Sequence, residues 1–429
     1  MSYTLFLILI CLVFVFLSWK KPLNGIYIIS AVLPTFLLRF NILGVPLTIL
    51  ETLILLLFLI CLAQKKIDFK KFYSQPFFWP TFAILFFATI SIFTSPEKIG
   101  ALGIWKAYFI EPVLFFIILI SNIKSRKQLE GVFWALGASI IYLGLFGFWQ
   151  KFSVWGVPKA FQTLSGGTDR VVSILNYPNA VGLYFGPIII LYVGWLFASL
   201  KNFTKVNKQE ILSLSFKILV IIIGLLGIAL AKSAGAVISV VVVLTILGLL
   251  NKKIRPWLLG LVVVGLLVFF LDNNFRNYLI TKLTLNEYSG FIRRLIWQES
   301  FNMLKDNWLW GAGLDGYQTK ILPYHSKAFE VFMYPHNIIL NFWSEVGILG
   351  LLAFIYLGVK YFLTNLKVFM AKVSAIDSYQ KVMAVTFIFV LVQMILHGLV
   401  DAPYFKNDLS VLFWIFMAGA IINKELKRG

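Results

Sequence analysis

The polar residues best suited to chemistry stand directly before a long apolar run near the C-terminal end. They form the segment Tyr334-Pro335-His336-Asn337, and the apolar run begins at residue 338. Because proline suits the first helical position, we expect His336 in the first turn of a membrane-spanning helix. Free N–H groups and the positive end of the helix dipole there favour a nearby anion and disfavour protonation of the imidazole. A neutral histidine in this position could act as a general base. The alternative is a polar anchor at the membrane surface.

The apolar run that follows carries a stripe of residues at helical spacing. Leu340, Trp343, Gly347 and Gly350 follow His336 at intervals of three or four residues, so they are predicted to share one face of the helix. The two glycines would let another helix approach closely. Packing is the favoured interpretation of the glycines.

Four basic residues are candidates for holding a phosphate group. Arg293 and Arg294 lie upstream of His336, before the cluster Gly311-Ala312-Gly313, and a guanidinium suits phosphate. Alternatively, these arginines pair with Glu287 or Glu299. Two further candidates are Lys232, which stands in an otherwise apolar hairpin where an ionisable group suggests function, and Arg170. Simple extension to the membrane surface would also account for Lys232.

The composition indicates which elements must position these residues. Of 429 residues, 60% are hydrophobic and only 13% are charged, which is too few charges for a soluble surface of this size. Apolar segments long enough to span a membrane recur along the chain. We therefore predict an all-α, polytopic integral membrane protein with about 12 or 13 spans. The candidate spans are residues 3–19, 22–38, 46–63, 77–93, 107–121, 130–149, 178–198, 211–230, 234–250, 256–271, 338–363, 382–400 and 409–423.

The net charge of +20 is explained by topology rather than by an acidic partner. Lysines and arginines concentrate in short cytoplasmic loops, and here they gather at alternate joints between spans. A nucleic-acid binder would instead collect them on one soluble face, so no nucleic-acid partner is expected. The groups are Lys65, Lys66, Lys70 and Lys71; Lys124, Arg126 and Lys127; Lys201, Lys205 and Lys208; Lys252, Lys253 and Arg255; and Lys424, Lys427 and Arg428.

This assignment divides the chain into three predicted parts. Residues 1–271 form an N-terminal transmembrane region, residues 272–337 a large external loop, and residues 338–429 the last spans with a cytoplasmic tail. A second external segment covers about residues 150–177. Loops of such length are usually functional, so the chemistry is expected on the outer face.

The motifs around His336 resemble those of the O-antigen ligase and O-antigen polymerase superfamily. His336-Asn337-x-x-Leu340 with Gly347 and Gly350 is similar to that family's HNxxL and GxxG signature. Arg293-x-x-x-Trp297 and the 311–313 glycine cluster resemble its RxxxW and GxG segments. Weaker similarities are Asn176-Tyr177-Pro178-Asn179 and the segment from His397 to Asp401, so the resemblance covers most of residues 170–420.

The resemblance implies a membrane glycosyltransferase of the GT-C type in the bacterial inner membrane, involved in lipopolysaccharide or exopolysaccharide biosynthesis. It would move a glycan from undecaprenyl diphosphate onto lipid A core, as a ligase, or onto a lipid-linked repeat, as a polymerase. By this resemblance His336 is the base and Arg293 binds the diphosphate. Arg170, Lys232 and Arg294 are further candidates for diphosphate binding, with no metal and no other cofactor expected.

One motif departs from the family pattern. Lys232-Ser233-Ala234-Gly235 has alanine where the family often has the arginine of a Ser-Arg-Gly motif, so we predict that Lys232 supplies the missing cation. His397 and Asp401 are expected to form a structural hydrogen bond along one helix face. The rival functional hypothesis is a transporter or flippase of lipid-linked sugars, which would place polar groups near the membrane midplane.

Overall fold

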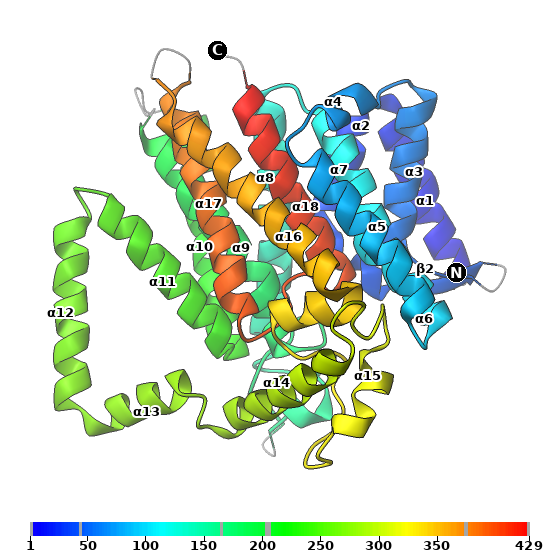
Figure 1. The fold of residues 1–429 in the computed structure, drawn as a ribbon. Helices are drawn as coiled ribbons and strands as arrows, with labels where there is room; N and C mark the ends of the chain where they lie inside the picture. The colour runs from blue at the N-terminus through cyan, green and yellow to red at the C-terminus, as the bar shows by residue number, and fades with distance from the viewer. Residues whose placement is uncertain (1–2, 43–44, 164–165, 202–206, 373–375, 427–429) are drawn as a thin grey trace.

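The computed structural model describes residues 3–42, 45–163, 166–201, 207–372 and 376–426 (Figure 1). Apart from its connecting segments, the described chain is helical, with one short antiparallel hairpin of β1 (Arg39–Ile42) and β2 (Val45–Thr48) and an isolated bridge. This confirms the prediction of an all-α, polytopic membrane protein. The α-helices are α1 (Tyr3–Lys20), α2 (Pro22–Ala31), α3 (Ile49–Ala63), α4 (Phe69–Tyr73), α5 (Phe78–Thr94), α6 (Lys98–Ile104), α7 (Glu111–Asn122), α8 (Arg126–Trp149), α9 (Pro178–Lys201), α10 (Lys208–Ala231), α11 (Ala234–Leu250), α12 (Arg255–Leu271), α13 (Asn273–Leu283), α14 (Tyr288–Asp306), α15 (Tyr317–Lys320), α16 (Ile338–Met370), α17 (Ser378–Gly398) and α18 (Asn407–Glu425).

Each predicted span overlaps helical structure, although the span 46–63 begins in β2 and its helix, α3, starts at Ile49. Among the described residues, six helices are long and apolar enough to cross a membrane, and five shorter apolar helices accompany them. The predicted span 22–38 is wrong as a single helix, because it divides into α2 and a 3-10 helix from Leu33 to Leu37. Pro34 lacks an N–H and disfavours helical geometry in the residue before it, which explains the division.

The predicted span 107–121 belongs to a longer helical stretch. Helix α6 continues through a π-helical turn, Trp105–Ile110, into α7, and together they cover Lys98–Asn122. The π-helical turn admits one extra residue per turn. Lys106 lies in this turn, and its ammonium pairs with Glu51 of α3 at 3.1 Å.

Helix α18 lies at the centre of the bundle, where other helices surround it (Figure 1). Every residue from Asn407 to Asn423 is buried. Helix α9 is similarly enclosed between α10 and α17, and 83% of its apolar central stretch is buried. These two helices therefore present little surface to lipid.

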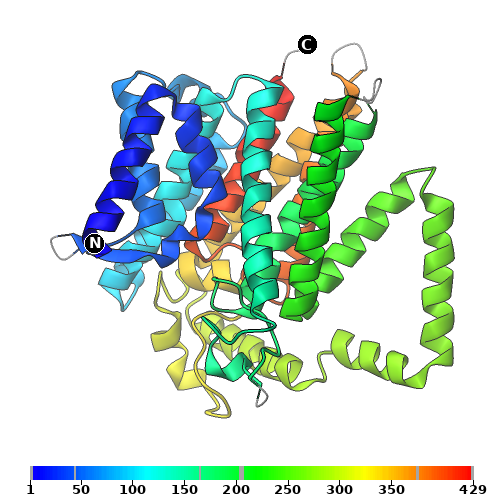
Figure 2. The ribbon, with the colours of Figure 1, turned by 180° about the vertical axis from the view of Figure 1, so that it is seen from behind.

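The connections gather at two opposite ends of the bundle. One end, at the top of Figure 1, carries α4, the start of α8 and the end of α18; we call it the basic end. The opposite end carries residues 150–163, 166–177, 284–337 and 399–406; we call it the loop end (Figure 2). The described basic groups at α4, the start of α8, the start of α10 and the end of α18 lie at the basic end, as the alternation predicts. The turn between α11 and α12, which carries Lys252 and Lys253, lies part-way along the bundle (Figure 1). Lys205, Lys427 and Arg428 lie outside the described residues.

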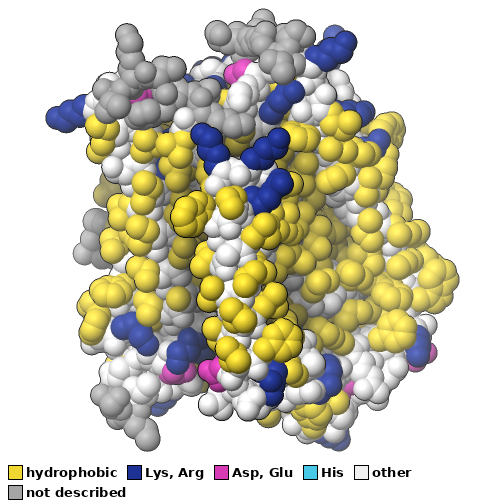
Figure 3. Space-filling view, turned by 90° about the vertical axis from the view of Figure 1, so that its left-hand side faces the viewer, with side chains coloured by type: hydrophobic (Ala, Val, Ile, Leu, Met, Phe, Trp, Pro, Cys, Tyr) yellow, Lys and Arg dark blue, Asp and Glu magenta, His cyan; other side chains and the backbone are white. Residues whose placement is uncertain are grey.

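Helices α11 and α12 form a hairpin beside the main bundle (Figures 1 and 2). No described side chain of α12 is buried. On this side of the molecule, hydrophobic side chains cover the middle of the surface, and lysines and arginines gather towards its two ends (Figure 3). This distribution matches the apolar core and polar boundaries of a bilayer.

Helix α16 is broken at Gly347, whose φ of 71° and ψ of 176° are not helical. The segment 309–313 from the loop end fills the break. Ser344 O accepts hydrogen bonds from the N–H groups of Ala312 and Gly313, and Ile348 N–H donates to Leu309 O at 3.2 Å. Side chains at either Gly347 or Gly311 would collide with the facing backbone. The predicted glycine stripe on α16 is therefore interrupted. Gly347 admits a loop, and Gly350 lies close to Phe87 of α5.

Candidate active site

His336 lies just outside α16 rather than in its first turn. The helix begins at Ile338, and Asn337 is its N-cap, because the Asn337 side chain accepts hydrogen bonds from the N–H groups of Ile339 and Leu340. An asparagine caps a helix well, so the helix starts after it and not at Pro335. His336 adopts a left-handed conformation with φ of 49°. The prediction of a first-turn histidine is therefore wrong, because His336 lies two residues before the first residue of the helix.

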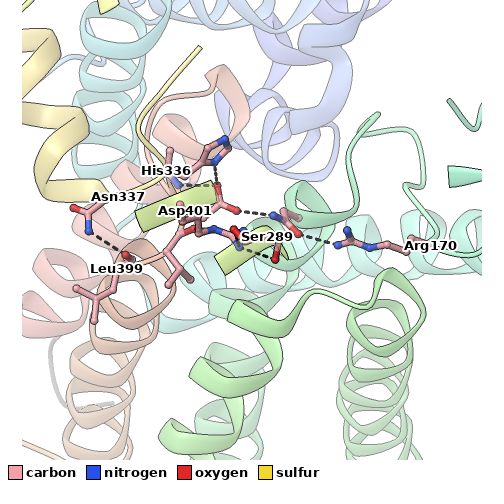
Figure 4. Close-up of polar contacts among 10 residues, drawn as sticks. Arg170, Ser289, His336, Asn337, Leu399 and Asp401 are labelled. Atoms are coloured by element: carbon pink, nitrogen blue, oxygen red, sulfur yellow. Dashed lines mark hydrogen bonds and ion pairs between the residues drawn. The ribbon is translucent and has the colours of Figure 1, made fainter. Parts of the chain in front are cut away.

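The imidazole of His336 faces the carboxylate of Asp401, which lies in the connection between α17 and α18 (Figure 4). The distance from Nδ1 to Asp401 Oδ1 is 3.2 Å, and the two side chains are 30% and 6% exposed. A carboxylate accepts a hydrogen bond, so it favours the tautomer with the proton on Nδ1. That tautomer leaves the lone pair of Nε2 available as a base.

Asp401 is held as an anion. Burial alone would raise the pKa of the Asp401 carboxyl, but the hydrogen bond and charge of His336, the neighbouring His397 and the N–H of Ala402 hold this pKa below its usual range. The predicted hydrogen bond between His397 and Asp401 is wrong. Asp401 turns to His336, and Nδ1 of the buried His397 has no partner among the described residues. Helix α17 ends at Gly398, so the i, i+4 geometry on which the expectation rested is lost.

A hydrogen-bonded chain extends from Asp401 to Arg170 (Figure 4). Asn179, in the first turn of α9, donates from Nδ2 to Asp401 Oδ2 at 3.0 Å. Its Oδ1 accepts a hydrogen bond from Arg170 Nη2, also at 3.0 Å. Arg170 Nε donates in turn to Ala231 O, at the end of α10. Residues from four separate parts of the chain are thereby fixed relative to His336.

Arg293 approaches the same connection from α14. Its Nε donates to Val400 O at 3.0 Å, next to Asp401, and its Nη1 bonds to Ser289 one turn earlier. The alternative pairings with Glu287 and Glu299 do not occur, since Glu287 pairs with Lys282 and Glu299 with His325. Arg293 is near enough to Arg170 for their charges to repel. Arg170 is also attracted electrostatically to Asp169 and Glu287, but in the described part of the chain neither guanidinium forms an ion pair with them within 4 Å.

Lys232 and Arg294 take different positions from Arg293. Lys232 ends α10 in a left-handed conformation, and its ammonium forms an ion pair with Asp169 in which both side chains are more than half exposed. That pair keeps the pKa of Asp169 below its ordinary value. Lys232 O also accepts a hydrogen bond from Arg170, so Lys232 borders the cluster. The side chain of Arg294 is exposed on α14, and none of the described contacts joins it to the cluster.

The loop before His336 is tied to α14. His325 Nδ1 lies 3.0 Å from Glu299 Oε2, and its Nε2 lies 2.8 Å from Phe329 O. Phe332 then presents its ring to the ring of His336, with centroids 5.5 Å apart. These contacts fix the segment 325–332 that precedes His336. The segment 309–313 is fixed separately, by its hydrogen bonds to the break in α16.

The structure brings together His336, Arg293 and Arg170, with Lys232 at the edge, and adds Asp401 and Asn179. Both added residues belong to motifs that the sequence singles out, but not as partners of His336. The arrangement offers a base with an oriented imidazole, beside two unpaired guanidinium groups suited to an anion. Among the described residues, no group of three or more His, Cys, Asp or Glu side chains comes close enough to hold a metal ion.

Comparison with known proteins gives two similarities. The family described as O-antigen ligase matches residues 219–355, a range that includes Lys232, Arg293 and the whole segment around His336. An O-antigen ligase of Salmonella typhimurium is 23% identical to this chain over 305 residues, which are 68% of this chain and 70% of that protein.

Proposed function

Because this chain belongs to the O-antigen ligase and O-antigen polymerase superfamily, we propose that it transfers a glycan from undecaprenyl diphosphate to an acceptor hydroxyl at the outer face of the bacterial inner membrane. The observation that carries the proposal is the connected set of His336, Asp401, Asn179 and Arg170, with Arg293 beside it. A base and a group of cations are what transfer from a diphosphate carrier requires.

The proposed reaction is a displacement at the anomeric carbon of the donor glycan. His336 Nε2 takes the proton of the acceptor hydroxyl as its oxygen forms the new glycosidic bond. The bond between the anomeric carbon and the diphosphate oxygen breaks, and the diphosphate leaves with the electron pair. Asp401 orients the imidazole and stabilises its protonated form, which then returns the proton to water.

The cations serve the leaving group in this proposal. The departing diphosphate gains negative charge, and fixed guanidinium groups stabilise that charge without reorganising. Arg293 and Arg170 are held by hydrogen bonds to main-chain carbonyls and Asn179, so their positions are set before substrate binds. Lys232 would contribute from the edge of the cluster, and Arg294 least. The protein's own residues supply the chemistry without a metal or other cofactor.

The acceptor is lipid A core for a ligase or a lipid-linked repeat for a polymerase, and product length separates the two. One transfer to a foreign acceptor indicates a ligase, whereas a ladder of repeats indicates a polymerase. A transporter of lipid-linked sugars remains the alternative function. Against it, the polar cluster lies at the loop end of the bundle and not halfway along the spans.

The test uses purified chain in detergent with undecaprenyl diphosphate glycan and each acceptor. We expect wild-type protein to transfer glycan and His336→Ala to lose at least about a hundredfold in rate, the usual minimum contribution of a general base. Transfer by His336→Ala at the wild-type rate would rule out this base. Absence of transfer by wild-type protein with both acceptors, alongside carrier translocation in vesicles, would favour the transporter.

A further inference from the structure

A basic cleft opens at the basic end of the bundle, far along the chain from the His336 cluster. It lies between the segment after α3 and the connection from α7 to α8, and its volume is about 630 Å³. The cleft is lined by Lys65, Lys66, Ile67, Asp68, Phe69, Lys70, Ser121, Asn122 and Lys124. Four of these nine residues are lysines, and one is acidic.

The walls of the cleft are joined by hydrogen bonds, so its shape does not depend on an occupant. Asp68 N–H donates to Ser121 Oγ at 3.0 Å, and Asn122 Nδ2 donates to Lys66 O at 3.3 Å. Asn122 also bonds to Ile118 O within α7. The two walls come from segments more than 50 residues apart, and these contacts hold them at a fixed separation.

The protein offsets only part of the positive charge of the cleft, because one carboxylate, that of Asp68, faces four lysines. Asp68 is engaged as the N-cap of α4, where Oδ1 accepts a hydrogen bond from Lys71 N–H. Glu425 pairs at 2.6 Å with Lys71, which does not line the cleft. In the part of the chain that the structure describes, no ion pair involves Lys65, Lys66, Lys70 or Lys124. An anion is therefore the complementary ligand.

Exposed aromatic and apolar side chains lie beside the cleft, on α4 and at the end of α3. Phe69 and Tyr73 of α4 are 39% and 59% exposed, and their rings stack with centroids 6.5 Å apart. Tyrosine is enriched at the membrane surface. Leu59 and Leu62, on the last turns of α3, are also exposed. A phosphate in the cleft would thus have apolar surface beside it for acyl chains.

We infer that this cleft binds the phosphate of an anionic phospholipid from the leaflet that the lysine distribution assigns to the cytoplasm. Basic pockets between membrane helices on this side are suited to anionic head groups. The inference does not depend on the proposed glycosyl transfer. It differs from general attraction between a basic protein and an acidic membrane, because it requires one defined set of lysines.

The test compares two double variants that remove equal charge from the protein. Lys70→Gln with Lys124→Gln changes the cleft, and Lys252→Gln with Lys253→Gln changes the exposed turn between α11 and α12. Native mass spectrometry measures phosphatidylglycerol and phosphatidylcholine retained by the intact chain. We expect the cleft variant to retain phosphatidylglycerol about 25-fold more weakly, or about fivefold for each lysine, and the turn variant to resemble wild type.

Equal losses in the two variants, or equal retention of phosphatidylcholine and phosphatidylglycerol by wild type, would overturn the inference. Inorganic phosphate at millimolar concentration provides a further arm. If it displaces phosphatidylglycerol completely, the site is one for free phosphate and the lipid assignment is wrong. The single variants Lys70→Gln and Lys124→Gln give the same comparison should the double variant fail to fold, with about fivefold loss expected for each.

Discussion

The imidazole Nδ1 of His336 lies 3.2 Å from Asp401 Oδ1, although the two residues are 65 positions apart and stand before different helices. The carboxylate is almost fully buried, whereas the histidine is 30% exposed. This relationship orients the imidazole and directs Nε2 away from the carboxylate. It also makes Asp401 the residue through which Asn179 and Arg170 are connected to the proposed base.

Replacing Asp401 by asparagine should reduce the rate of transfer with little effect on donor binding. An amide can donate to His336 Nδ1 and thereby favour the wrong tautomer, with the proton on Nε2. We expect a loss of about a hundredfold or more in kcat, measured with saturating lipid-linked glycan. A large rise in KM with unchanged kcat would show instead that Asp401 serves the donor site.

Adjacent arginines on α14 provide a matched pair for testing the cation cluster. Arg293→Ala removes a guanidinium beside Arg170, and we expect donor binding to weaken about tenfold to a hundredfold, the range for a hydrogen bond to a charged group. Arg294→Ala removes the same charge from an exposed position and should change binding by less than about twofold. Binding of the carrier diphosphate, measured by tryptophan fluorescence, distinguishes the two. Equal effects would contradict the assignment.

The break in α16 should tolerate no side chain at Gly347. Alanine there would hold an unfavourable positive φ and collide with Leu309 O, at a cost of about 1–3 kcal/mol. Gly358 lies on the same helix, and nothing lies within 4 Å of the place that an added methyl group would take there, so Gly358→Ala should change stability by no more than about 1 kcal/mol. Melting temperatures in detergent check this. Equal stability of the two variants would show that the break is not constrained by the 309–313 segment.

The contact between His325 and Glu299 should make the loop before His336 sensitive to pH. The hydrogen bond to Glu299 raises the pKa of His325, which burial opposes. Burial would raise the pKa of Glu299, but hydrogen bonds from Ser326 and His325 hold it below its ordinary value. His325 therefore stabilises the loop fully below its ordinary pKa of 6.5 and loses this effect as pH rises through the raised value. Glu299 stabilises the loop above its ordinary pKa of 4.5.

Stability of this loop should accordingly be greatest between about pH 4.5 and pH 6.5, the two ordinary pKa values. Hydrogen exchange in residues 325–332, corrected for the intrinsic pH dependence of exchange, measures the effect. We expect greater protection at pH 5.5 than at pH 8, and His325→Gln should abolish the difference. An unchanged difference in that variant would assign the pH sensitivity to another group.

The sequence by itself determined the membrane class and most of the helical spans, and it singled out the basic joints and His336 as the candidate base. These features are local. A span is recognised from one continuous apolar segment, and a basic joint is recognised from the lysines and arginines between two neighbouring spans. The family motifs also lie in short segments. The chain alone could therefore identify His336 and Arg293, and it located most helices to within a few residues.

Only the tertiary structure decided which residues meet at His336. Asp401, Asn179 and Arg170 come from the α17–α18 connection, the start of α9 and the 150–177 segment, and no local periodicity relates them. Even the local expectations failed where distant backbone intervened, as at Gly347, where the 309–313 segment enters the helix. The physical reason is that hydrogen bonds between distant segments depend on how the helices pack, and hydrophobic periodicity specifies which face is apolar but not which partner it meets.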